Sequence, residues 1–247
     1  MADRTCRHDD RGPLTVLTIE RPERRNAVDL ETLLALEEAI VATAANPDKR
    51  VLIITGSDGH FCAGADLTGV EDTTFVETLS RVLNGLRNAP FPTIAAVEGA
   101  ALGAGTQLAV ACDLRVAAAD ATFGIPASKL GLMVDQWTVR RIADMLGPGP
   151  ARAMLLAADT ITGQQALALG LVQRIGTCDL ALEWAHHIAT LAPLTIAGHK
   201  LGLNQCEELP PTTPEYREAF ERAWASEDLQ EGLSSFRERR VPKFRGI

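Results

Sequence analysis

The 247-residue sequence predicts an α/β core followed by an α-helical C-terminal region. A fully apolar run at residues 51–54 and a largely apolar run at residues 93–97 have the length and composition of buried strands, and segments of helical spacing flank them. After Cys178 nearly every segment has helical spacing, and prolines separate these segments. Strands interleaved with helices, followed by a helical end, are typical of an α/β core with a helical appendage.

The N-terminal part of the chain is expected to alternate strands with helices. Residues 14–20 alternate in the manner of a strand, which Pro22 ends. Asp29 is a candidate N-cap for a helix over residues 30–45, whose apolar positions have helical spacing. A second helix is expected over residues 74–88, before two prolines and the second apolar run.

The rest of the chain continues this pattern and then becomes helical. Short strands are expected at residues 114–117 and 122–123, and a helix that follows them ends at Gly147 and Pro148. Helices and short strands then alternate up to Ile175. Four helices complete the chain, over residues 180–191, 193–205, 213–225 and 228–239, and no fixed-period repeat is visible.

Composition and charge argue against several classes of protein. The net charge is −8, and no basic patch suggests a nucleic-acid partner. No signal peptide is visible, and no apolar run approaches the roughly 18 residues of a membrane span, so no integral membrane association is expected. The cationic tail is either a solvated face, a subunit contact or a contact for an anionic ligand; it contains Arg237, Arg239, Arg240, Lys243 and Arg245.

The cysteines and histidines do not form a metal-binding pattern. Five cysteines are scattered along the chain without a CxxC pair, which favours neither a zinc site nor a disulfide framework. We therefore expect a reducing, cytoplasmic location in which the cysteines act as small apolar residues. The five histidines are dispersed, and no metal site is expected.

Two turns of small residues mark the candidate functional site. Residues 103–105, Gly-Ala-Gly, precede an apolar helical run, and a helix that starts there directs free N–H groups and a positive dipole end forward. Residues 63–66, Ala-Gly-Ala-Asp, form a second such turn after the apolar strand. Together they suit a site where negative charge develops; the alternative is that these small residues only permit close packing.

The sequence resembles the enoyl-CoA hydratase/isomerase, or crotonase, family over nearly its whole length. The resemblance is carried, in this order, by RPERRNAV, FCAGADL, PTIAAVEGAALGAGTQLAVACDLRVAA, ATFGIP, ITGQQALALGLVQRI and a tail with KF. The segment QLAVACDLRV, followed by PASKLGLMVDQWTVRR, is further similar to an actinobacterial and mycobacterial subgroup of hydratase-like acyl-CoA-binding proteins.

The resemblance implies a fold and an assembly. It implies a crotonase (ClpP-like) spiral of ββα units over residues 1–190, which carries the acyl-CoA site. Residues 191–247 would form the helical region that packs subunits into a homotrimer or hexamer, with a tail that contacts CoA. No permanently bound cofactor is implied; a coenzyme A thioester is the ligand or substrate, and an enzyme of lipid metabolism is a further candidate partner.

The resemblance also implies individual site residues. The family holds the thioester carbonyl oxygen with two backbone N–H groups, which by motif match belong to Ala65 and Ala104. The CoA contacts that match the family motifs are Arg24, Arg25, Ala27, Ala63, Asp66 and Leu67, with Lys243 and Phe244 from the tail. Arg24 and Arg25 are either partners for phosphates or a solvated pair in a loop.

The sequence departs from the family at both catalytic glutamates. By motif match the first would fall at Gln107 and the second at Ala127, where neither residue is a carboxylic acid. Glutamine holds a water molecule by hydrogen bonds but does not accept its proton, and alanine offers no polar atom. These replacements argue against the ordinary hydration mechanism.

One further carboxylate, Asp135, stands in an otherwise apolar run. It matches the position at which related dienoyl-CoA isomerases and a dehalogenating relative carry a working aspartate. The alternatives are the N-cap of the next helix and another structural or ligand-contact role. Two functions therefore stay open. The first is an acyl-CoA-binding protein of fatty-acid metabolism with a retained oxyanion hole; the second is a crotonase-type isomerase or lyase in which Asp135 moves the proton.

Overall fold

The computed structural model describes residues 5–68, 73–206 and 214–245. Packing divides the chain into two compact units, Met1–Phe123 with Thr162–Glu207, and Gly124–Ile161 with Glu208–Ile247. These two units are defined by packing within the chain. The predicted boundary at residue 190 separates instead a spiral core from a helical region that packs subunits together, and it stays a prediction.

A six-stranded sheet of order β1-β2-β3-β4-β6-β9 forms the centre of the first unit. The strands are β1 (Cys6–Arg11), β2 (Leu14–Ile19), β3 (Val51–Gly56), β4 (Thr93–Val97), β6 (Leu114–Ala117) and β9 (Arg174–Ile175). Only the β1–β2 pair is antiparallel among these described strands; the other pairs are parallel, with Leu14 opposite Val51 and Leu52 opposite Thr93. Every residue of β2 and β4 is buried, as expected for parallel strands covered on both faces.

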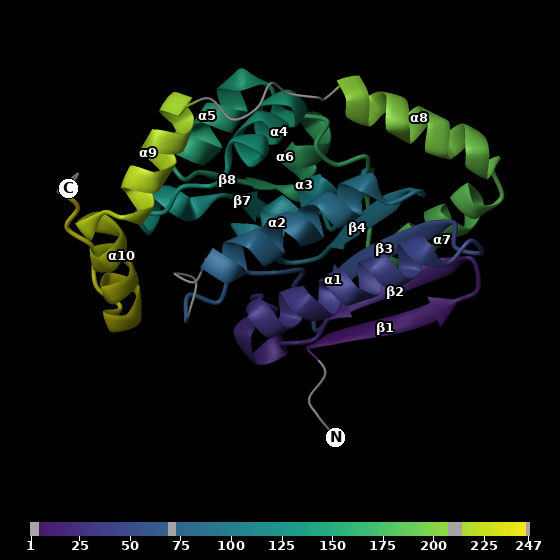
Figure 1. Ribbon diagram of the computed structural model, residues 1–247, viewed down its shortest axis with the longest axis horizontal. Helices are drawn as coiled ribbons and strands as arrows, with labels where there is room; N and C mark the ends of the chain where they lie inside the picture. The colour runs from purple at the N-terminus through teal and green to yellow at the C-terminus, as the bar shows by residue number, and fades with distance from the viewer. Residues whose placement is uncertain (1–4, 69–72, 207–213, 246–247) are drawn as a thin grey trace. The chain divides into compact units, whose positions relative to one another are not determined.

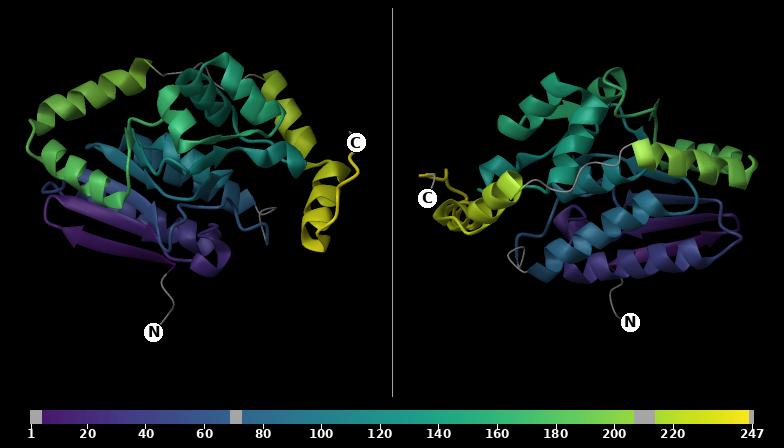
Figure 2. Two further views of the ribbon diagram at one scale, coloured as in Figure 1. Left: turned by 180° about the vertical axis from the view of Figure 1, so that it is seen from behind. Right: turned by 45° about the horizontal axis from the view of Figure 1, so that its top comes forward.

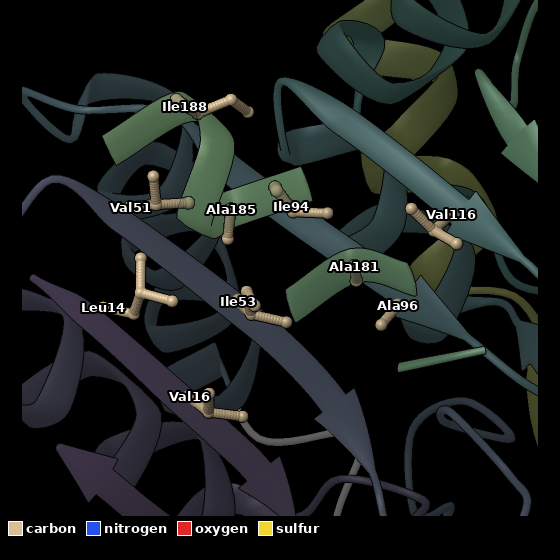
Figure 3. Close-up of a cluster of buried hydrophobic side chains, with 10 residues drawn as sticks. All are labelled: Leu14, Val16, Val51, Ile53, Ile94, Ala96, Val116, Ala181, Ala185 and Ile188. Atoms are coloured by element: carbon tan, nitrogen blue, oxygen red, sulfur yellow. The ribbon is translucent and has the colours of Figure 1, made fainter. Parts of the chain in front are cut away.

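Helices cover both faces of this sheet. In Figure 1, α1 (Leu30–Ala45) and α2 (Thr73–Asn88) lie side by side in front of the strands. Seen from behind in Figure 2, α7 (Cys178–Ala189) crosses the strands on the other face. Figure 3 shows Ala181, Ala185 and Ile188 of α7 packed over Ile53 and Ile94 of the sheet, which builds the core on this face.

The predicted N-cap of α1 is confirmed. The Asp29 carboxylate accepts the backbone N–H of Thr32 at 2.8 Å and the Thr32 hydroxyl at 2.7 Å. The helices after Cys178 are confirmed as well, because α7 is followed by α8 (Pro193–Cys206), α9 (Pro214–Trp224) and α10 (Glu227–Glu238). Strand β1 is an addition to the predicted elements: its sequence, CRHDDR, is polar because it forms an exposed sheet edge, so no apolar pattern marks it.

Short elements complete the first unit. They are the 3-10 helix η1 (Pro22–Arg24), β5 (Ala100–Leu102), α3 (Ala104–Ala111), β7 (Thr122–Gly124) and α6 (Gly163–Ala168). Strand β5 is hydrogen-bonded to β7 in a second, small sheet. Helix α3 is buried along its whole length and follows directly on β5, so its N-terminus is fixed in place by the sheet.

The second unit is built mainly from helices. It contains η2 (Pro126–Lys129), α4 (Gln136–Leu146) and α5 (Pro148–Leu156), with α9 and α10, and β8 (Thr160–Thr162) lies at its boundary. A Cβ atom on Gly232 of α10 would lie 2.3 Å from the carbonyl oxygen of Leu130, so glycine permits this close approach. The indole N–H of Trp224 donates to the Met133 carbonyl at 3.0 Å and holds the segment before α4.

Candidate functional site

The two turns of small residues lie against each other in the first unit. A Cβ atom added to Gly64 would lie 3.2 Å from the Leu102 carbonyl oxygen, and one added to Gly103 would lie 3.9 Å from the Cα atom of Gly64. Both glycines have positive φ, +121° at Gly64 and +52° at Gly103, which other residues rarely adopt. The backbones that carry Ala65 and Ala104 are therefore adjacent, as the two-turn hypothesis requires.

The backbone around Ala65 leaves its N–H group free. Val28 and Ala65 form an isolated parallel bridge, in which the Val28 N–H donates to Gly64 O at 2.9 Å and the Asp66 N–H donates to Val28 O at 2.7 Å. Since bonding groups alternate along an extended segment, the N–H of Ala65 itself faces away from Val28. It has no hydrogen-bond acceptor in the part of the chain that the structure describes.

Ala104 offers a second free N–H group at the start of α3. Gly103 occupies the N-cap position, and Ala104 is the first residue of the helix, so its N–H group has no acceptor within the helix. Among the described residues, none accepts the Ala104 N–H. The positive end of the helix dipole adds to the attraction for negative charge there. The two turns thus supply what an oxyanion hole needs, which is backbone donors next to small residues.

Arg21 braces the segment that carries Ala65. Its guanidinium group donates to the Ala27 carbonyl, and its Nη2 atom lies 2.9 Å from Asp29 Oδ2 and 3.1 Å from Asp66 Oδ2. Burial raises the pKa of the Asp66 carboxyl, but the backbone N–H of Thr68 and the Arg21 guanidinium lower it further, so it lies below its usual range. Arg21 was not among the predicted site residues; its place at the end of strand β2, beside Pro22, was the available signal.

The predicted CoA-binding arginines lie in an exposed turn. Arg24 and Arg25 are both exposed, and the Arg25 carbonyl accepts the backbone N–H of Ala63 at 3.0 Å. This bond brings the Arg24–Ala27 turn beside the loop of Ala63, Asp66 and Leu67, so all six predicted contact residues belong to one region. Asn26 was not among the predicted site residues either. It is fully buried, and its amide nitrogen donates to Ser57 O at 2.8 Å, which fixes the turn in place.

Gln107 occupies the first turns of α3. It is 7% exposed, and its backbone N–H donates to the Gly103 carbonyl at 3.0 Å. Gln107 is therefore held in the same short helix as Ala104, and its alignment with a catalytic acid stays a prediction. Glu98, the other acid nearby in the sequence, accepts the backbone N–H of Cys178 at 3.4 Å, which gives it a structural position at the start of α7.

The remaining predicted residues belong to the second unit. Ala127 lies in η2, and its carbonyl accepts the N–H groups of Leu130 and Leu132, each at 3.0 Å. Asp135 stands at the N-cap position of α4, and its carboxylate accepts the Thr138 hydroxyl. Burial raises the pKa of the Asp135 carboxyl, although the bond from Thr138 opposes this effect.

The tail is held by a local ion-pair cluster. Arg240 pairs with Glu231 at 2.6 Å and with Glu238 at 2.6 Å, and the Lys243 N–H donates to Glu231 at 2.8 Å. The Lys243 and Phe244 side chains are exposed, which leaves them available for contacts.

The buried cysteines of the first unit are Cys62, beside the first turn, and Cys112, at the end of α3. Burial raises the pKa of Cys62 and of Cys112 to about 12 each, so both thiols are protonated and unreactive at neutral pH. Within the residues that the structure describes, no group of three His, Cys, Asp or Glu side chains is placed to hold a metal ion. In the same ranges, no helix is both long and apolar enough to cross a membrane.

Comparison with known proteins identifies the family. The family model for enoyl-CoA hydratase/isomerase matches residues 10–246. The chain belongs to the enoyl-CoA hydratase/isomerase family. Among its members, a Mycobacterium tuberculosis protein named probable enoyl-CoA hydratase echA6 is 43% identical over 234 residues, which are 94% of this chain and 96% of the relative.

Solved structures of proteins that, by name, act on CoA thioesters have the same fold. Carnitinyl-CoA hydratase from Mycobacterium avium matches with a TM-score of 0.89 and 30% identity over 100% of both chains. Methylmalonyl-CoA decarboxylase in complex with 2-nitronate-propionyl-CoA matches with a TM-score of 0.90 and 25% identity, again over 100% of both chains. The predicted crotonase fold, with α-helices at its C-terminal end, is thereby confirmed.

Proposed function

We propose that this protein binds acyl-CoA thioesters and holds the thioester carbonyl oxygen between the N–H groups of Ala65 and Ala104. The observation that carries the proposal is the contact between the Gly64 and Gly103 turns, each of which precedes a backbone N–H with no acceptor among the described residues. Two such donors complement an oxygen that gains negative charge. The similar methylmalonyl-CoA decarboxylase is in complex with a CoA derivative, which supports the same ligand class here.

The coenzyme A portion has candidate contacts in the same region. The turn of Arg24, Arg25 and Ala27 and the loop of Ala63, Asp66 and Leu67 are joined by the Ala63–Arg25 hydrogen bond. Arginines are well suited to phosphate, because their planar guanidinium groups donate two parallel hydrogen bonds. Lys243 and Phe244 are proposed to add contacts from the tail. No permanently bound cofactor is needed for this role.

We propose that the protein does not hydrate 2-enoyl-CoA. Hydration in this family needs groups that take a proton from water and give one to carbon, and Gln107 and Ala127 provide neither. Each positioned acid or base contributes about 10²–10⁴-fold to a rate, so loss of both removes most of the acceleration. Because the binding groups are retained while the acid and base are lost, we assign the protein a role in fatty-acid metabolism as a binding protein.

We also propose a homo-oligomer, a trimer or a hexamer, in the cytoplasm. Helix α8 exposes Leu194, Leu201 and Leu203 at 87%, 60% and 65%, which favours a covered surface in an assembly. The five cysteines are free, as suits a reducing compartment. An enzyme of lipid metabolism is proposed as a further partner.

Calorimetry and an activity assay test the proposed function together. Titration with acetyl-, octanoyl- and palmitoyl-CoA is expected to show saturable binding, tighter than for free CoA. The absorbance of crotonyl-CoA and of a long-chain 2-enoyl-CoA should fall no faster with the protein than in buffer. Absence of saturable binding contradicts the binding role, and hydration above the buffer rate contradicts the non-hydrating role.

The environment of Asp135 favours a second candidate function, an isomerase or lyase. Burial raises the pKa of its carboxyl, which brings this group closer to the range useful for proton transfer near neutral pH. In that case Asp135 would move a proton at the substrate while the two N–H groups stabilise the enolate. Turnover that Asp135→Asn abolishes would select this candidate over the binding protein.

A further inference from the structure

We infer that Arg21 is a positioning residue for the Ala65 N–H donor, an inference that rests on the proposed acyl-CoA site. Arg21 does not belong to either small-residue turn. It holds the two chain segments whose pairing fixes the direction of that N–H group, and its contacts are divided between them.

The first segment is the one that contains Val28. The Arg21 guanidinium donates to the carbonyl of Ala27, directly before Val28, and pairs with the carboxylate of Asp29, directly after it, at 2.9 Å. The Arg21 backbone is itself fixed, because its N–H donates to the buried Asn26 side chain at 2.9 Å. The Arg21 side chain thus contacts the residue before Val28 and the residue after it.

The second segment is the one that contains Ala65. The same Nη2 atom that meets Asp29 lies 3.1 Å from Asp66 Oδ2, next to Ala65. The Val28–Ala65 bridge joins the two segments by a pair of backbone hydrogen bonds, at 2.9 and 2.7 Å. A bridge of this length is weak by itself, so the buried charge contacts of Arg21 hold its register.

Burial makes these contacts effective. The side chains of Arg21 and Asp66 are only 14% and 13% exposed, so solvent screens the pair much less than a surface ion pair. Lysine does not reproduce this arrangement, because its single ammonium group lacks the planar fork that reaches a carbonyl and two carboxylates together. If Arg21 is removed, the Ala65 segment is expected to move relative to Val28 and to misdirect its N–H.

The test separates the carbonyl contact from CoA binding as a whole. Acetyl-CoA and its thioether analogue S-ethyl-CoA have acyl and alkyl groups of similar size, but only the thioester has a carbonyl oxygen. We expect the wild-type protein to prefer acetyl-CoA by about tenfold or more, as for a net gain of one or two hydrogen bonds. Arg21→Met is expected to reduce this preference about tenfold while the affinity for S-ethyl-CoA stays within about threefold.

A spectroscopic signature gives a second readout. The infrared C=O stretch of [1-¹³C]acetyl-CoA should fall in frequency on binding to the wild-type protein, because both N–H groups withdraw electron density from the oxygen. Arg21→Met should bind with a smaller frequency change, and Arg21→Lys should recover part of it. Arg7→Met is the matched control. Arg7 lies on strand β1 and pairs with Glu20 at 2.9 Å and with Asp9 at 3.4 Å, and its loss should leave the preference for acetyl-CoA and the infrared spectrum unchanged.

The outcomes distinguish this inference from the proposed function. If the wild-type protein prefers the thioester and Arg21→Met does so equally, with the same C=O frequency, the inference is wrong and the acyl-CoA site stands. If the wild-type protein binds neither compound or shows no preference, both are wrong. Should Arg21→Met not fold, Asp66→Asn removes the negative charge that Arg21 pairs with on the Ala65 segment. Because any change in CoA contacts affects acetyl-CoA and S-ethyl-CoA alike, this variant must reduce the preference for acetyl-CoA, or the inference fails.

Discussion

Gly105 lies so close to Cys62 that a Cβ atom added to it would be 2.1 Å from the Cys62 carbonyl oxygen. Both residues belong to the backbone framework of the candidate site, since Cys62 pairs with Ala101 and Gly105 follows Ala104. Any side chain introduced at residue 105 would therefore push the two turns apart.

Gly105→Ala is expected to destabilise the protein and to weaken acyl-CoA binding. The overpacking should cost about 1–3 kcal/mol in free energy of unfolding, because a rigid backbone has to move. Gly149→Ala in α5 is the matched control, since its Cβ would have no heavy atom within 4 Å, and it should be neutral or stabilising by up to about 1 kcal/mol. Denaturant unfolding measures both variants; equal stability of Gly105→Ala and wild type would contradict the close contact.

Restoration of the two acids should restore hydration. The double variant Gln107→Glu with Ala127→Glu places carboxylic acids at the two positions where the family resemblance predicts a proton acceptor and donor, so it should hydrate crotonyl-CoA at least about 10²-fold faster than wild type. Each single variant should remain close to wild type, because both groups act in one reaction. The assay follows crotonyl-CoA absorbance. A double variant no faster than wild type would contradict this prediction, and a wild-type rate above that in buffer would show that other groups carry out the hydration.

Asp135 is tested through proton exchange at carbon. In deuterium oxide, the binding role predicts that wild-type protein and Asp135→Asn exchange the α-protons of octanoyl-CoA no faster than buffer. Mass spectrometry of the recovered thioester measures the exchange. Rapid exchange by wild type that Asp135→Asn removes, at unchanged octanoyl-CoA affinity, would instead establish Asp135 as a catalytic acid-base group.

Acid should weaken the fold partly through Asp66. Its folded-state pKa lies below the ordinary value of 3.8, so its ion pair with Arg21 stabilises the protein fully above that value. This stabilisation is lost as the pH falls below 3.8 through the depressed folded-state pKa. Urea unfolding between neutral pH and about pH 2.5 should show a smaller acid-induced loss in Asp66→Asn than in wild type. If the free energy of unfolding falls equally with pH in wild type and Asp66→Asn, the ion pair of Asp66 makes no such contribution.

Arg115 is expected to be essential for the stability of the segments that follow α3 and α6. It is 3% exposed, and its guanidinium donates to the carbonyls of Cys112 at 2.7 Å and Asp113 at 3.1 Å, just beyond α3, and to Leu171 at 2.5 Å. Arg115→Met should cost about 3 kcal/mol or more, because buried carbonyls lose their donors.

The control for Arg115 is Arg174→Met. Arg174 lies 3.9 Å from the ring centroid of Trp184 and makes a cation–π contact at the surface, so its loss should cost about 1 kcal/mol or less. Thermal and denaturant unfolding of both variants give the comparison. A similar small cost at Arg115 would mean that water replaces its hydrogen bonds.

Local pattern was sufficient for most of the fold. The apolar runs predicted β3 and β4, and the Asp29 cap placed the start of α1, because burial and capping act over a few residues. The polar strand β1 was missed because its stability comes from pairing with β2, which its own composition does not reveal. Pairing partners distant in the sequence are not encoded in a local pattern.

In the candidate site, too, features set by local sequence were predicted, whereas a feature that depends on a distant partner was missed. Small residues identified both turns, since close approach restricts the residue type at each position. Arg21 was missed because its role depends on Asp66, 45 residues away in the sequence. Among three arginines in RPERR, local sequence favoured the two in the turn, whereas the fold turns the first one inward, where it is 14% exposed.

The two proposed donors at Ala65 and Ala104 are main-chain groups, and this has a consequence for how the protein can diverge. Any side chain small enough to fit, with proline excepted, leaves such a donor in place. The Val28–Ala65 bridge and the start of α3 set the donors, whereas the predicted acid and base positions, 107 and 127, would act through their side chains. Substitutions at those two positions can therefore add or remove acid and base groups while the proposed backbone donors stay in place. Few substitutions would then convert an enzyme of this kind into a binding protein, or the reverse.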